Sequence, residues 1–152
     1  MPELSKPGLS LMKIENTTFI FIFGGYSVDE DKAVSDIIAV DVDHLEWWYV
    51  RVEGGNVAPR ICPVVVAVKQ KLYIFSGFKK FSKKECYPFK SYSIASYSAP
   101  RGWRWEARDV PYSCPAGFDH QLFGSGIAVY DGKKILLTPG RVYFQEDLKA
   151  RH

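Results

Sequence analysis

The fold is decided by the stretch Thr18-Phe19-Ile20-Phe21-Ile22-Phe23-Gly24-Gly25, an apolar run that ends in a double glycine. A run of this length and composition is typical of a strand that is buried on both faces. The glycines stop it because they adopt turn conformations that other residues avoid. A shorter version, Leu72-Tyr73-Ile74-Phe75-Ser76-Gly77, follows later in the chain. No segment keeps a helical period for three turns, so a repeated unit of strands is expected.

Each apolar run belongs to a longer set of short strands. The first set is predicted at residues 9–14, 18–23, 36–41 and 46–52, and the second at 63–68, 71–75, 92–97 and 103–108. A third set begins at 126–129 and 134–137 and then fades. Gly25 and Gly77 lie 52 residues apart, and Gly77 and Gly140 lie 63 apart. Four strands at this spacing are the unit of a β-propeller blade, while an antiparallel β-sandwich stays open as an alternative.

The order of an apolar strand, a double glycine, an aspartate, a tryptophan and a Pro-Arg pair resembles the kelch repeat, best over residues 18–78. The second copy departs from it with Ser76-Gly77 and Ser91, and the third with Pro139-Gly140. The positions that carry the repeat are Gly24, Gly25, Asp36, Trp48, Gly77, Trp105 and Gly140. The resemblance implies that Trp48 and Trp105 are equivalent residues of the outer strands, packed between blades.

The expected fold class is therefore all-β, with kelch-like blades of four antiparallel strands in an incomplete ring of about 2.5 to 3 blades. A single domain is expected over residues 1–152, with a first blade at about 9–52, a second at about 63–108 and a partial third at about 125–144. An incomplete ring leaves apolar flanks uncovered. We therefore expect either a second copy that completes a propeller or a longer propeller of which this chain is a part.

Composition narrows the class of protein. The 152 residues are 47% hydrophobic and 24% charged with a net charge of +3, as in an ordinary globular domain. That charge is too small to favour nucleic acid or a membrane surface as the main partner. Residues 19–23 form the longest apolar stretch, which is too short to cross a bilayer, and the first residues lack the pattern of a signal peptide. A cytoplasmic location is expected.

Catalytic motifs are missing from the sequence. The three histidines do not stand at metal-ligand spacing from one another, and the three cysteines form no CxxC pair; these residues are His44, His120, His152, Cys62, Cys86 and Cys114. The sequence therefore predicts no enzyme, no cofactor and no metal site.

Long loops are predicted on one face of the blades, at Tyr26–Ser35, Glu53–Cys62, Phe78–Lys90 and Val110–Phe123, whereas the opposite loops are tight turns. Binding residues concentrate on long loops held by a rigid scaffold. A basic, aromatic patch is expected there, and the candidate partner-binding residues are Arg60, Lys79, Lys80, Phe81, Lys83, Lys84, Tyr112 and Phe118.

A non-catalytic protein-interaction module is the function that these features favour. Two alternatives remain. The chain could be part of a propeller enzyme or ligand-binding protein whose site lies on other blades. The segment Lys79–Lys84 could also bind RNA or an acidic ligand, since lysines there alternate with an aromatic residue.

Overall fold

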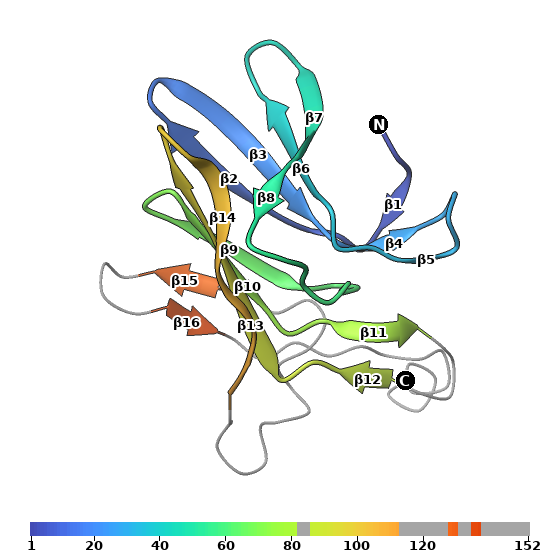
Figure 1. The fold of residues 1–152 in the computed structure, drawn as a ribbon. Coiled ribbons are helices and arrows are strands. Elements are labelled where there is room, and N and C mark those ends of the chain that lie inside the picture. Colours follow the sequence, from blue (N-terminus) through green and yellow to red (C-terminus); the bar gives the residue numbers. More distant parts are fainter. Residues whose placement is uncertain (82–85, 113–127, 131–134, 138–152) are drawn as a thin grey trace, which may run out of the picture.

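The computed structural model describes residues 1–81, 86–112, 128–130 and 135–137 (Figure 1). In this part of the chain every regular element is a β-strand, and there is no helix that could span a membrane. The expected all-β class is confirmed.

The first sheet has the strand order β2-β3-β6-β7, and all of its neighbours are antiparallel. Its strands are β2 (Gly8–Ile14), β3 (Thr17–Phe23), β6 (Ile37–Asp41) and β7 (Glu46–Val50). These are the four strands predicted for the first set, shifted by no more than two residues at each end. We call this sheet the first sheet throughout.

The second sheet repeats the same meander. Its order is β8-β14-β13-β10-β9, built from β9 (Val64–Val68), β10 (Lys71–Phe75), β13 (Ser91–Ser98), β14 (Gly102–Pro111) and β8 (Val52–Glu53). Strands β9, β10, β13 and β14 are the four predicted for the second set. The fifth strand, β8, comes from the segment that leaves the first sheet, and it pairs parallel to the start of β14.

A third unit begins as predicted with an antiparallel hairpin, β15 (Ala128–Tyr130) and β16 (Ile135–Leu137). The rest of the expected third blade, with Gly140, lies outside the described residues. The units follow one another side by side, since β2 lies beside β9 and β9 lies beside β15 (Figure 1).

The glycine ends of the two sheets are built alike. The amide of Gly24 donates a hydrogen bond to the carbonyl of Asp36 (3.1 Å), and the amide of Ser76 donates to the carbonyl of Ser91 (3.2 Å). Ser91 therefore takes the place of the aspartate in the second unit, as the sequence predicts. Gly24 has a φ of 68°, and a Cβ there would lie 2.6 Å from the carbonyl oxygen of Arg60, so the close approach requires glycine.

The tryptophans differ from the expectation. Counted from the glycine ends, Ala95 of the second sheet corresponds to Val40 of the first. Ala95 lies opposite Trp105, and Val40 lies opposite Trp47. The counterpart of Trp105 is therefore Trp47 and not Trp48. Trp105 is 9% exposed between the sheets, whereas Trp48 is 43% exposed at the sheet margin. Trp48 lies in the same row as the core residues Phe21 and Ala39, and its ring packs against Phe19 with the centroids 5.8 Å apart. Both tryptophans therefore face the space between the sheets as expected, but only Trp105 is buried there. Adjacent residues of a strand point to opposite faces, so a shift of one residue changes the face.

The core lies between the facing sides of the two sheets. Buried apolar side chains from both sides make one cluster: Met12, Ile14, Phe21, Phe23, Ile37, Ala39, Val57, Leu72, Ile74, Ala95, Trp103 and Trp105. The ring centroids of Phe21 and Trp103 lie 5.0 Å apart across the interface. Gly8 on β2 allows close approach, because a Cβ there would lie 2.6 Å from the side chain of Val65 on β9. Each buried side chain of this size contributes roughly 1.5–3 kcal/mol, so the sheets form one packed unit.

A candidate binding site at the long-loop end

The long connections of both sheets emerge at the same end. They follow β3, β7 and β10, and Figure 1 shows them gathered opposite the tight turn that joins β2 to β3. The predicted placement of the long loops is confirmed for these three. Most of the fourth, Val110–Phe123, lies outside the described residues.

The first long loop folds into a small sheet with the N-terminal segment. Its order is β1-β4-β5, with β1 (Leu4–Ser5), β4 (Tyr26–Ser27) and β5 (Lys32–Ala33). The amide of Val28 also donates to the carbonyl of Glu3 (3.1 Å), and the amide of Val34 to the carbonyl of Gly25 (3.0 Å). These bonds hold the N-terminus against the loop and the open end of the first sheet.

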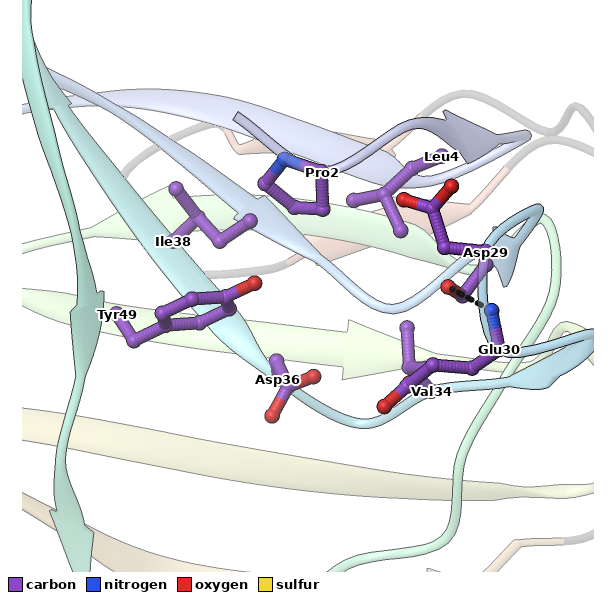
Figure 2. Close-up of a pocket in the computed structure, with 9 residues that line it drawn as sticks. Pro2, Leu4, Asp29, Glu30, Val34, Asp36, Ile38 and Tyr49 are labelled. Atoms are coloured by element: carbon purple, nitrogen blue, oxygen red, sulfur yellow. Dashed lines mark hydrogen bonds between the residues drawn. The ribbon is translucent and has the colours of Figure 1, made fainter.

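A pocket of about 430 Å³ lies between this small sheet and the first sheet (Figure 2). It is lined by Pro2, Leu4, Ser27, Asp29, Glu30, Val34, Asp36, Ile38 and Tyr49. Figure 2 shows the ring of Tyr49 between Pro2 and Asp36, with the loop carboxylates on the side away from Ile38. The pocket thus combines an apolar wall with an acidic margin.

Local hydrogen bonds fix the acidic margin. The amide of Glu30 donates to the hydroxyl of Ser27 (3.2 Å), the bond drawn in Figure 2, and Ser27 is itself buried. The hydroxyl of Tyr26 donates to the carboxylate of Asp31. The turn that carries Asp29 and Glu30 is therefore held by its own side chains, and both carboxylates face solvent.

This arrangement suits a ligand with a cationic group and an apolar body. Buried Ile38 and Val34, with the half-exposed Tyr49 ring, offer apolar contact, and the carboxylates of Asp29 and Asp36 offer charge. Within the described residues, no three His, Cys, Asp or Glu side chains come together in a way that could hold a metal ion. Apolar contact beside charge is the pattern of a peptide-binding surface.

Arg60, expected among the partner-binding residues, lies in the interior instead. Its side chain is 0% exposed and bridges the two loops that flank the second sheet. One terminal nitrogen donates to the carbonyls of Ser76 (2.7 Å) and Ser91 (2.9 Å). The other donates to the hydroxyl of Ser91 (2.7 Å) and the carboxylate of Asp109 (2.8 Å). Burial lowers the pKa of the Arg60 guanidinium, and the hydrogen bond to Asp109 partly offsets this effect by raising it.

Asp109 completes this network from the edge of β14. Its carboxylate accepts hydrogen bonds from the amide of Ala58 (2.9 Å) and the hydroxyl of Ser93 (3.3 Å) in addition to Arg60. The ring of Phe89 lies 4.5 Å from the guanidinium carbon. Arg60 is therefore a structural residue that joins three segments, and it does not reach a partner.

The remaining candidates are spread over the third loop and beyond it. That loop was predicted only as a long connection, and it contains two paired strands, β11 (Phe78–Phe81) and β12 (Cys86–Pro88). Lys79 is exposed, with its ammonium nitrogen 5.5 Å from the Phe89 ring. Tyr112 is half-buried, and its hydroxyl forms a hydrogen bond with that of Ser76. The backbone of Lys80 and Phe81 belongs to β11, while Lys83, Lys84 and Phe118 lie outside the described residues.

Sequence reasoning missed most of the pocket. The run Asp29-Glu30-Asp31 was visible as an acidic loop, but Pro2, Leu4 and Tyr49 gave no signal. β1 has only two residues, which is too short for any periodicity. No protein-family model matches this sequence, and a comparison with curated proteins gave no significant match.

Proposed function

We propose that this chain is a non-catalytic protein-interaction module, in which kelch-like β-propeller blades hold binding loops at one end. The observation that carries the proposal is the pocket at the long-loop end, where Ile38 and Tyr49 of the first sheet meet the carboxylates of Asp29, Glu30 and Asp36. A rigid sheet that positions exposed loop side chains is a common basis for recognition.

The partner that this pocket fits is a protein segment with arginine or lysine beside leucine-like residues. The carboxylates attract the cationic groups, and the apolar wall removes the neighbouring side chains from water. The chain as a whole has a net charge of +3, so long-range attraction does not favour a cationic ligand. Binding of such a ligand therefore depends on the local acidic margin.

Fluorescence anisotropy with two labelled peptides tests this function. One peptide alternates leucine with arginine, and the other alternates leucine with glutamate. We expect the arginine peptide to bind the wild-type chain. The combined change Asp29→Asn, Glu30→Gln and Asp36→Asn should weaken that binding by more than about tenfold.

A matched control removes three carboxylates at the tight-turn end, through Glu15→Gln, Asp43→Asn and Glu46→Gln. It changes the net charge by the same amount and leaves the pocket intact, so binding should stay within about twofold of wild type. Equal losses in both variants would show that only overall charge matters. Preference for the glutamate peptide would point to the lysine-rich third loop instead, as would binding of a single-stranded RNA.

A further inference from the structure

The face of the first sheet that points away from the second sheet is apolar across all four strands. Residues directly opposite one another in an antiparallel ladder share a face. The register gives two complete rows on this face, Leu9–Ile22–Ile38–Tyr49 and Leu11–Ile20–Val40–Trp47. Leu11 is 62% exposed and Tyr49 is 54% exposed, whereas Ile38 is buried at the pocket that Pro2 and Leu4 also line. We call these two rows the open face.

The same rows are buried in the second sheet. When the two sheets are aligned on their glycine ends, the row Leu11–Ile20–Val40–Trp47 corresponds to Ala67–Leu72–Ala95–Trp105 of the second sheet. Leu72 and Ala95 are 0% exposed, because the inner side of the first sheet covers them. The open face is thus the counterpart of a surface that, one unit later, is covered by a four-stranded sheet.

The units also pack in a constant order. β2 of the first sheet lies beside β9 of the second, and β9 lies beside β15 of the third unit. Each unit therefore presents one side to the unit before it and the other side to the unit after it. Among the described strands, the open face and the β15–β16 hairpin are therefore the two ends of this series.

We propose that the open face docks the β15–β16 end of a second copy of this chain. Such a contact continues the order seen within the chain, and it is head-to-tail. If each copy contributes its open face to one contact and its β15–β16 end to the other, two copies form a closed dimer with two identical contacts, which we call seams. The open face shares Ile38 and Tyr49 with the pocket at the long-loop end, but the proposed contact rests on the row that contains Leu11 and Trp47, which does not line the pocket.

The exposed apolar area of the open face sets the size of this contact. With roughly 150–250 Å² for each large side chain, the exposed parts of Leu9, Leu11, Trp47 and Tyr49 amount to roughly 400 Å², within the roughly 300–600 Å² of the largest apolar patch on a typical monomer. Two such seams bury roughly 800 Å² of the open faces alone, and a stable interface buries about 1,200–2,000 Å² from both partners together.

Size-exclusion chromatography with light scattering on the full chain tests the proposal. We expect twice the monomer mass of 17.3 kDa over the micromolar range. A charge at either end of the row Leu11–Ile20–Val40–Trp47, through Leu11→Lys or Trp47→Lys, should raise the dimer dissociation constant by more than about tenfold. Leu45→Lys is the control, because Leu45 is even more exposed but lies on the tight turn outside both rows, and this variant should remain a dimer.

Circular dichroism accompanies each variant, and a native spectrum with a cooperative melt shows that the charged side chain has not unfolded the sheet. A wild-type mass of 17.3 kDa throughout would overturn the proposal. So would a mass that grows without limit as concentration rises, or a dimer that survives both open-face substitutions. The carboxylate variants that test the loop-end pocket leave both rows intact and should stay dimeric, so the two proposals fail separately.

Discussion

Replacing Arg60 by methionine should destabilise the protein more than any other single change of a charged residue in the described part of the chain. The guanidinium is fully buried and satisfies two backbone carbonyls, a hydroxyl and the Asp109 carboxylate. Removing one partner from a buried pair costs about 3–5 kcal/mol. Asp109 is 34% exposed and keeps two other donors, so we expect a value near the lower end, about 3 kcal/mol. Most of it reflects the carbonyls left without a donor.

The assay is urea unfolding followed by tryptophan fluorescence, at one protein concentration because association would shift the midpoint. Arg60→Lys should recover less than half of the loss, because a single ammonium cannot span acceptors on three segments. Arg104→Met is the control, since Arg104 is exposed on β14, and it should stay within about 0.5 kcal/mol of wild type. A loss below about 1 kcal/mol for Arg60→Met would refute the assignment of this network as the joint between the loops.

Three further predictions follow from packing, backbone and charge. Trp105→Ala should lower the free energy of unfolding in the same urea assay by about 3–5 kcal/mol, and Trp48→Ala by less than about 2 kcal/mol, because only Trp105 is buried. Equal losses in the two variants would contradict the register given above. Gly24→Ala should cost more than about 2 kcal/mol, and Gly102→Ala only about 1, since both have positive φ but nothing lies within 4 Å of a Cβ at the second position. A hydrogen bond to the carboxylate at the end of β6 raises the pKa of His44 above 6.5. His44→Ala should therefore lower the melting temperature slightly near pH 5.5 and not at about pH 9, and a pH-independent difference would rule out this linkage.

The strands were predictable, but their faces were not. Apolar runs, glycine pairs and tight turns mark strand ends directly, so the boundaries of β2, β3, β9 and β10 follow from local chemistry. Trp47 and Trp48 are adjacent and equally apolar, and the ladder between β13 and β14 contains irregularities that shift its register. Spacing along the chain cannot show which of two neighbouring residues corresponds to Trp105 when a bulge intervenes.

The site was less visible than the fold for a related reason. Charged residues are almost never fully buried unless they are paired. Without knowledge of its partner, Arg60 is therefore predicted from the sequence to lie at the surface. Its partner Asp109 lies 49 residues away, and no local pattern connects them. The pocket likewise depends on Leu4 and Tyr49, which meet only after the N-terminal segment has paired with the first loop.

The short strand β8 has a consequence for association of a different kind. It places Val52 and Glu53 against Trp103 and Arg104, at the outer border of the second sheet. Without it, the start of β14 would expose unpaired amides and carbonyls, which recruit strands from other molecules and lead to aggregation. Because β8 belongs to the segment that leaves the first sheet, one linker both joins the sheets and blocks this border. The corresponding border of the first sheet is β7, which has no such cover among the described strands and carries Glu46 at its start and Arg51 just after its end. Charges at an edge strand discourage pairing with another chain, so lengthening the linker or neutralising these two residues should promote aggregation before it lowers stability.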